Sequence, residues 1–229
     1  MNLGMMEMTK EDILKDLLMT PSPSGCEQAI IKKMAMFLKD YIDELSIDNY
    51  GNLIALKYGN QRNKKLMLAA HADEVGMMVT YIDSNGFLSF QEIHNRNGIV
   101  TGIIGQKPIH LQDRDAKAKD YDAEDLWIDI AANGKKDAER MVEIGDYITY
   151  QTQPLSLKHE VWTSKALDDK VGLLTLIEVA KALSGKLPAM DVYFVVSVQE
   201  ELGARGIRTA TLGINPEQGI AIDVTHATD

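Results

Sequence analysis

The sequence predicts a mixed α/β domain that is assembled from both ends of the chain and interrupted by a β-rich insert. Three observations predict this architecture. Residues 9–70 contain both helical and strand-like patterns. Residues 75–162 hold short β-like runs that are separated by turn residues. After residue 164, helical patterns alternate with apolar strands, which is typical of a sheet covered by helices.

The first two elements are expected to be helices. The segment from Thr9 to Asp12 resembles a capping box and precedes an apolar stripe, with Pro21 as a stop. The segment from Ser24 to Glu27 repeats the signal before a second stripe. The two stripes consist of Ile13, Leu14, Leu17, Leu18, Ile30, Ile31, Met34, Phe37 and Leu38. We interpret both as helix faces that pack on a core.

The period then changes to that of strands. Residues 44–48 and 52–58, with a turn at 49–51, predict a hairpin, and residues 66–70 predict a buried strand. The insert then offers short strands that suit a small barrel or sandwich, at residues 75–82, 87–93, 98–104, 126–130 and 147–151. Its segment 113–125 mixes both charge signs and is predicted to be a solvated loop.

The last part of the chain returns to alternating elements. Helices are predicted at residues 169–183 and 204–212, and strands at 192–198 and 219–224. The domain boundaries follow from these textures. The α/β domain comprises residues 1–73 and 164–229, and the β-rich insert comprises residues 74–163.

The composition excludes several classes of function. The 229 residues include 24 basic and 34 acidic ones, so the net charge of −10 would repel a phosphate backbone and disfavours nucleic-acid binding. The single cysteine, Cys26, excludes a disulfide within the chain and favours a reducing compartment, so we expect a cytoplasmic protein. No apolar run approaches the roughly 18 residues that a membrane span needs.

Metal-competent side chains directly follow four short apolar segments that are expected to be strands, at residues 66–70, 164–167, 192–199 and 219–222. These side chains are His71, Asp73 and Glu74; Asp168 and Asp169; Glu200 and Glu201; and Asp223. Ligands in open α/β sheets bind at the carboxyl ends of strands, so these positions are expected to converge. Two unit charges about 4 Å apart repel by about 4 kcal/mol at an effective dielectric constant of about 20. A pair of divalent cations would supply the counter-charge.

The types of ligand narrow the choice of metal. Imidazole together with carboxylate suits zinc, cobalt or manganese better than calcium or magnesium. The spacing of His71 and Asp73 suits a ligand with a neighbouring carboxylate that fixes the imidazole tautomer. Either Asp168 or Asp169 could bridge two cations, because each needs only its two carboxylate oxygens free.

Six motifs, in this order, resemble the glutamyl, deblocking or tetrahedral aminopeptidases, a family of dinuclear metallopeptidases. They are PSPSG (21–25), AHADEVG (70–76), IGQKPIH (104–110), ALDDKVG (166–172), QEELGARG (199–206) and IDVT (222–225). The resemblance implies an α/β/α sandwich with a central mixed sheet, like other zinc peptidases, interrupted by a PDZ-like β-barrel insert. It also implies assembly through that insert into homo-oligomers, with peptides as substrates.

The resemblance also implies a division of roles. His71, Asp168, Glu201 and Asp223 would hold two divalent metal ions, with Asp168 as the bridge. Glu200 would be the general base and Asp73 would orient His71. A carboxylate-rich pocket would favour the free α-ammonium group of a peptide.

One part of the family pattern is missing from the sequence. The family has a further histidine ligand well downstream, whereas the other histidines here are His94, His110, His159 and His226. The sequence therefore predicts a truncated form with reduced or no activity. The alternative is a non-catalytic assembly or binding protein with a degenerate metal site. Related dinuclear deacylases and carboxypeptidases share the same core and remain a further enzymatic alternative.

Overall fold

The computed structural model describes residues 8–91, 99–106 and 126–226. The chain forms two compact units, one made of residues 1–74 and 150–229 and the other of residues 75–149. Residues 150–163, which the sequence pattern assigned to the insert, group with the larger unit. The predicted solvated loop at 113–125 lies outside the described residues.

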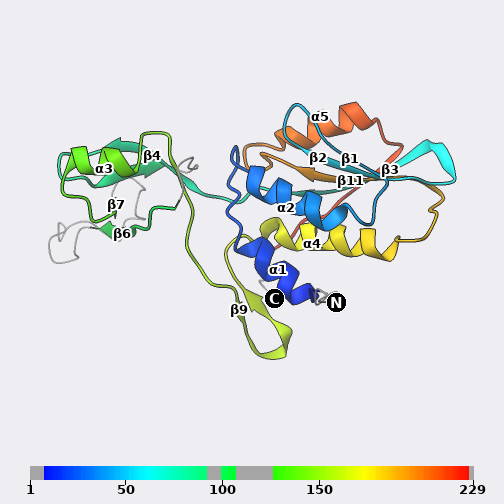
Figure 1. The fold of residues 1–229 in the computed structure, drawn as a ribbon, viewed down its shortest axis with the longest axis horizontal. Helices are drawn as coiled ribbons and strands as arrows, with labels where there is room; N and C mark the ends of the chain where they lie inside the picture. The colour runs from blue at the N-terminus through cyan, green and yellow to red at the C-terminus, as the bar shows by residue number, and fades with distance from the viewer. Residues whose placement is uncertain (1–7, 92–98, 107–125, 227–229) are drawn as a thin grey trace, which may run out of the picture. The chain divides into compact units, whose positions relative to one another are not determined.

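The larger unit contains most of the regular structure (Figure 1). Its helices are α1 (Lys10–Leu18), α2 (Gln28–Leu38), α4 (Leu167–Ala182) and α5 (Arg205–Ile214). Its main strands are β1 (Glu44–Ile47), β2 (Leu53–Lys57), β3 (Gln61–His71), β11 (Met190–Ser197) and β12 (Gln218–Ala221).

The five main strands form one mixed sheet in the order β1-β2-β11-β3-β12. The predicted hairpin is present as the antiparallel pair β1 and β2. β11 pairs antiparallel with β2 but parallel with β3, and β12 is also parallel to β3. Because β3, β11 and β12 run in the same direction, their carboxyl ends lie at one edge of the sheet.

Helices cover both faces of this sheet (Figure 1). On one face, buried side chains of α1, α2 and α4 pack with the strands in one cluster, which includes Leu17, Met34, Leu176 and Phe194. On the other face, Ala210 and Ile214 of α5 pack on buried residues of β3 and β11. The predicted layered α/β architecture is therefore present in the larger unit.

The two predicted helix starts have different outcomes. The capping box before α1 is confirmed, because Thr9 Oγ1 accepts the N–H of Asp12 at 3.1 Å and the Asp12 carboxylate accepts the N–H of Thr9 at 3.2 Å. The second box is wrong. α2 begins after Glu27 without a side-chain cap, and Ser24 instead donates to Asp73, a residue on a distant segment.

The smaller unit is built around an antiparallel sheet in the order β6-β7-β5-β4-β8. Its elements are β4 (Met77–Ile82), β5 (Leu88–Gln91), β6 (Ile103–Gln106), β7 (Leu126–Asp129), α3 (Lys135–Met141) and β8 (Tyr147–Ile148). Val79, Leu88 and Ile128 are among the residues of its own buried core. The described strands form an open sheet, and closure into a PDZ-like barrel stays a prediction.

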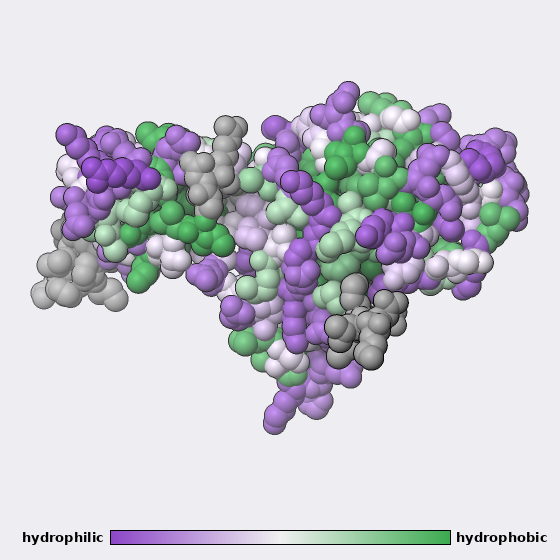
Figure 2. Space-filling view, viewed as in Figure 1, coloured by the Kyte–Doolittle hydropathy of each residue, from purple (hydrophilic) through white to green (hydrophobic). Residues whose placement is uncertain are grey.

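A short hairpin of the larger unit carries exposed apolar side chains. It consists of β9 (Leu155–Ser156), a 3-10 helix (Lys158–Glu160) and β10 (Trp162–Thr163). Leu155, Leu157 and Val161 are each more than half exposed, and hydrophobic patches are visible on this hairpin in Figure 2. Among the described helices, none combines the length and the apolar character that crossing a membrane requires.

Candidate metal centre

The predicted site residues meet at the edge of the sheet where β3, β11 and β12 end. His71 is the last residue of β3, Glu200 and Glu201 follow β11, and Asp223 follows β12. Asp168 and Asp169 enter from the first turn of α4, which begins at Leu167, so the strand expected at residues 164–167 is wrong. The parallel pairing of the three strands thus brings together side chains that are far apart in the sequence.

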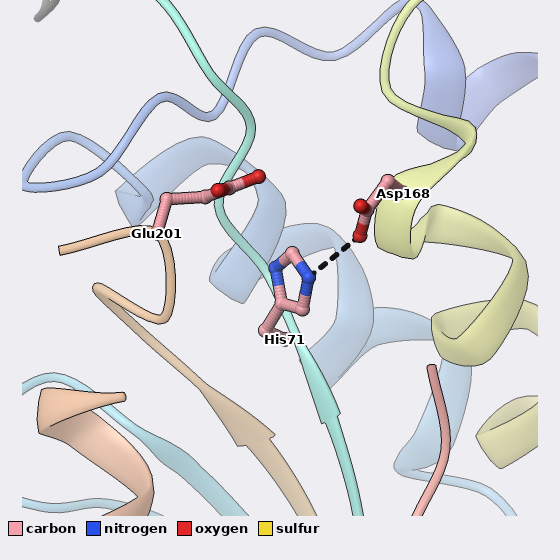
Figure 3. Close-up of side chains that lie close together, drawn as sticks. All are labelled: His71, Asp168 and Glu201. Atoms are coloured by element: carbon pink, nitrogen blue, oxygen red, sulfur yellow. Dashed lines mark hydrogen bonds and ion pairs between the residues drawn. The ribbon is translucent and has the colours of Figure 1, made fainter. Parts of the chain in front are cut away.

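A first group of potential ligands consists of His71, Asp168 and Glu201. One ligand atom of each lies within 4.8 Å of the others. Figure 3 shows that the three side chains converge from three separate segments. Nε2 of His71 lies 2.8 Å from Oδ1 of Asp168. The family resemblance implied a ligand role for each of these three residues.

A second group consists of His71, Asp169 and Asp223, again with one ligand atom of each within 4.8 Å. Asp169 is fully buried, and its carboxylate accepts the N–H groups of His71 at 3.2 Å and of Gly172 at 3.0 Å. The peptide bond between Asp168 and Asp169 is cis. The structure therefore gives both carboxylates a place, Asp168 in the first group and Asp169 in the second.

The imidazole of His71 is oriented from its Nδ1 side. Nδ1 lies 3.0 Å from the backbone oxygen of Asp73, and a carbonyl oxygen only accepts, so Nδ1 donates. In the neutral ring this leaves the lone pair of Nε2 free to bind a metal. Burial lowers the pKa of His71, but the hydrogen bond and charge of Asp73 and the charge of Asp169 raise it to about 10. In the protein alone the ring is therefore an imidazolium.

Asp73 connects the imidazole to the segment after β11. Its fully buried carboxylate accepts the N–H of Glu200 at 2.9 Å and that of Glu201 at 3.0 Å. The hydroxyl of Ser24 donates to the same carboxylate at 2.5 Å. Burial acts to raise the pKa of Asp73, but hydrogen bonds from His71 and Ser24 outweigh it and hold this pKa below its usual value. Asp73 therefore stays ionised.

The chain turns sharply between β11 and the two glutamates. β11 ends at Ser197, and Gln199 adopts a left-handed backbone conformation with φ of 55°. A regular strand would point Glu200 and Glu201 to opposite faces. Because the strand has ended, Glu201 joins the first ligand group, whereas Glu200 belongs to neither group.

The pKa values of the clustered carboxyl groups are shifted because these groups lie close together and are partly buried. Burial, aided by the charge of Asp223, raises the pKa of Asp169 to about 7. Burial and the charge of Asp168 also raise the pKa of Glu201. Such carboxyl groups gain from a cation, because the cation stabilises their charged forms.

The comparison with known proteins identifies the family. Residues 51–229 match the model of the M42 glutamyl aminopeptidases, which is most of the chain. The chain belongs to the M42 family. It is 35% identical over 235 residues to a lysyl aminopeptidase of Pyrococcus furiosus, covering 94% of this chain and 66% of the relative. The chain spans about two thirds of the length of the curated relatives it matches.

Two solved structures extend this comparison. An aminopeptidase of the archaeon Desulfurococcus kamchatkensis superposes with a TM-score of 0.89 at 32% identity, over 96% of this chain and 64% of that one. The Pyrococcus horikoshii TET1 peptidase, described as assembling into a tetrahedron or a large octahedral shell, gives a TM-score of 0.84 at 29% identity. That match covers 94% of this chain and 68% of that one. The mixed α/β fold of this M42 chain is therefore shared with aminopeptidases.

The lysines nearest the M42 ligand groups in sequence do not neutralise them. Glu74 pairs with both, at 2.6 Å from Nζ of Lys165 and 3.5 Å from Nζ of Lys170. Lys170 is fully buried and also donates to the backbone oxygen of Thr20 at 2.5 Å. Burial lowers the pKa of Lys170 to about 8, although the charge of Glu74 opposes this. These two lysines therefore do not supply the counter-charge that the ligand carboxylates require.

The donor set fits a divalent cation that accepts both nitrogen and oxygen ligands. A single imidazole with several carboxylates is a combination that zinc, cobalt and manganese accept. Both groups contain His71, whose free nitrogen can bind only one ion. The described residues therefore offer more ligands to one metal ion than to a second. His226 is exposed and belongs to neither group, and His159 lies in the 3-10 helix of the hairpin. His94 and His110 lie outside the described residues.

Sequence reasoning missed two residues that shape this centre. Ser24 donates to Asp73, and Glu27 accepts the N–H of Gln199 at 3.0 Å. Glu74, which was named as a metal-competent side chain, instead accepts the N–H of Ser22 at 2.8 Å. Ser24 and Glu27 lie in or beside the PSPSG motif, which was the one available signal. Their polar character was instead interpreted as a helix cap.

Proposed function

We propose that this chain is a metal-dependent aminopeptidase that releases N-terminal residues from peptides. The observation that carries the proposal is the convergence of His71, Asp168 and Glu201 from three separate segments. Membership of the M42 family supports the same reaction class. The carboxylates at this edge of the sheet would attract the free α-ammonium group that distinguishes the end of a peptide from its interior.

Two divalent metal ions, zinc or cobalt with manganese as a further choice, fit the proposal. His71, Asp168 and Glu201 would hold one ion, and Asp223 with Asp169 would hold the other. The family resemblance implies that Asp168 would be the bridging carboxylate. When bound, such ions polarise the scissile carbonyl and lower the pKa of water towards about 7.

The chain's own residues supply the proton transfers and the positioning. Glu200 would accept a proton from the attacking water and deliver it to the leaving amine, acting as general base and then general acid. Its backbone N–H is held by Asp73, which also contacts the imidazole of His71. Asp73 would therefore act in catalysis by orienting His71 and by fixing the base at the same time.

The remaining parts of the proposal concern assembly and cellular place. A homo-oligomer formed through the 75–149 unit, with a PDZ-like barrel, would be in line with the assemblies described for the Pyrococcus horikoshii TET1 peptidase. A cytoplasmic location stays a prediction from the single cysteine. The reduced activity expected for this chain also stays a prediction, and the assay below measures it.

The proposal is tested with aminoacyl p-nitroanilides and their N-acetylated counterparts, before and after chelation and after addition of Zn²⁺ or Co²⁺. We expect hydrolysis of the free-amine substrates only, loss of activity with the chelator, and recovery with metal. Preference for N-acetylated substrates would instead identify a deacylase. Tight metal retention without hydrolysis of either substrate would support the non-catalytic alternative and refute the aminopeptidase.

A further inference from the structure

Four consecutive backbone N–H groups after β11 are all accepted by side-chain oxygens. Asn52 accepts the N–H of Val198 at 3.0 Å and Glu27 accepts that of Gln199 at 3.0 Å. Asp73 accepts the next two, from Glu200 at 2.9 Å and from Glu201 at 3.0 Å. The N–H groups of residues 198–201 therefore do not depend on a neighbouring strand for hydrogen-bond acceptors. Side chains from three other segments fix their path.

The three acceptor side chains are themselves buried and held. Asn52 and Asp73 are fully buried, and Glu27 is 4% exposed. The Oε1 atom of Glu27 also accepts the N–H of Gly25 at 2.8 Å, which ties it to its own loop. An acceptor that is fixed in this way also fixes the position of the N–H group bonded to it, because a buried N–H group without a partner costs free energy.

Glu27 acts at the point where the chain changes direction. Gln199 has its φ at 55°, and the next residue is the proposed base Glu200. A residue other than glycine keeps this conformation only where its surroundings impose it. Glu27 accepts the Gln199 N–H on one side, and Tyr50 donates from its hydroxyl to the Gln199 side chain at 3.1 Å. The turn is therefore imposed from outside the ligand groups.

We propose that Glu27 is a positioning residue for the turn that carries Glu200 and Glu201. Its buried carboxylate holds the N–H of Gln199 and so fixes the backbone from which Glu201 joins the first ligand group while Glu200 is left to act as the base. The inference rests on the proposed function for the roles of Glu200 and Glu201, but the conformation of the turn can be observed without any reaction. Among the described residues, the side chain of Glu27 accepts hydrogen bonds from the backbone of Gly25 and Gln199 and from no member of either ligand group, so it acts through the backbone.

The first test measures hydrogen exchange of the amides of Gln199, Glu200 and Glu201 in the metal-free protein. Glu27→Ala should accelerate exchange at Gln199 by about 10- to 100-fold, because the lost hydrogen bond corresponds to about 1–3 kcal/mol. A cavity of about 180 Å³, lined in part by Glu27, Tyr50 and Gln199, already adjoins the turn and would admit water there. Glu27→Gln keeps an acceptor oxygen and should restore slow exchange.

Asp191→Ala provides a matched control at the other end of β11. Asp191 is 4% exposed and accepts the backbone N–H of Gly59 at 2.8 Å, so it is also a buried carboxylate that holds an N–H. Its loss should lower stability without selective acceleration at residues 199–201. If Glu27→Ala and Asp191→Ala change these amides alike, Glu27 is merely structural and the inference is overturned.

A second test uses metal affinity and kinetics. Glu27→Ala should weaken zinc binding by about 10- to 100-fold, as loss of supporting contacts around a metal site typically does. It should lower kcat more than it raises KM, and Glu27→Gln should recover both. If Glu27→Ala does not fold, Glu27→Asp, whose carboxylate is one methylene short, replaces it in every measurement.

The outcomes separate this inference from the proposed function. Selective acceleration at residues 199–201 in a chain that hydrolyses no peptide supports the positioning role and refutes the aminopeptidase. Peptide hydrolysis that persists at the wild-type kcat in Glu27→Ala, with unchanged exchange, refutes the positioning role and leaves the aminopeptidase intact.

Discussion

Nε2 of His71 lies 2.8 Å from Oδ1 of Asp168, which joins the end of β3 to the first turn of α4. In the protein alone this contact is an ion pair, since the pKa of His71 is raised to about 10 despite its burial. A divalent cation would take the place of the Nε2 proton and draw on the same carboxylate. Metal binding at this position therefore exchanges a proton for a cation.

Asp168→Asn should weaken metal binding without unfolding the chain. Even outer contacts around a metal are worth about 10- to 100-fold in affinity, so loss of a ligand should cost about 100-fold or more. The side chain of Asp168 is 55% exposed, so the Tm of the metal-free protein should change little. Zinc titration with a competing chelator measures the affinity. Glu178→Gln, which removes a carboxylate from the same helix, should match the wild type.

Metal binding should release protons at neutral pH. The pKa of His71 is raised to about 10, so its imidazole holds a proton that a cation displaces, and the pKa of Asp169 is raised to about 7, so its carboxyl group is partly protonated at neutral pH. Affinity should therefore rise from pH 6 towards pH 9, as these groups become easier to deprotonate. Calorimetric titration at pH 7.5 in two buffers of different ionisation enthalpy counts the protons, and we expect roughly one or more. A pH-independent affinity would show that His71 is not a ligand.

Glu200→Gln should separate catalysis from metal binding. Glu200 belongs to neither ligand group, so the zinc affinity should stay within error of the wild type. A general base contributes about 100- to 10,000-fold to the rate, so kcat should fall by that factor. Steady-state assays with an aminoacyl p-nitroanilide measure it. Unchanged kcat would move the base to another residue, and weakened metal binding would make Glu200 a ligand.

Two glycine substitutions in helices should have opposite effects. A Cβ at Gly172 would collide with the carboxylate of Asp169, so Gly172→Ala should destabilise by about 1–3 kcal/mol and weaken metal binding. Gly213→Ala, in α5, meets no atom within 4 Å and should stabilise by up to about 1 kcal/mol. Chemical unfolding of the metal-free chains measures both. Stabilisation by Gly172→Ala would show that Asp169 is not held as described.

Local signals allowed much of the larger unit to be predicted. The Thr9 capping box and the hairpin of β1 and β2 depend on residues close in sequence, so their patterns were sufficient. α3 was missed because it has only seven residues and buries only Ala138, which leaves no apolar period to detect. The convergence of His71, Glu201 and Asp223 was predicted from the rule that ligands bind at the carboxyl ends of strands. Asp168 joins them from the first turn of α4 instead of from a strand end.

The contacts that hold the site could not be predicted in the same way. Ser24 meets Asp73 across 49 positions and Glu27 meets Gln199 across 172, so no local pattern reveals either pair. The local sequence from Ser24 to Glu27 instead resembles a helix cap. Lys170 directly follows Asp169 in the sequence, but its pairing with Glu74 depends on how the start of α4 is buried.

The most direct test of the metal centre is the metal content of the wild-type chain and of His71→Ala after loading with Zn²⁺ and exhaustive dialysis. Elemental analysis should find at least one zinc ion per wild-type chain and much less in the variant, with both proteins folded by circular dichroism. Equal zinc in the two proteins, or no zinc retained by the wild type, would contradict the account.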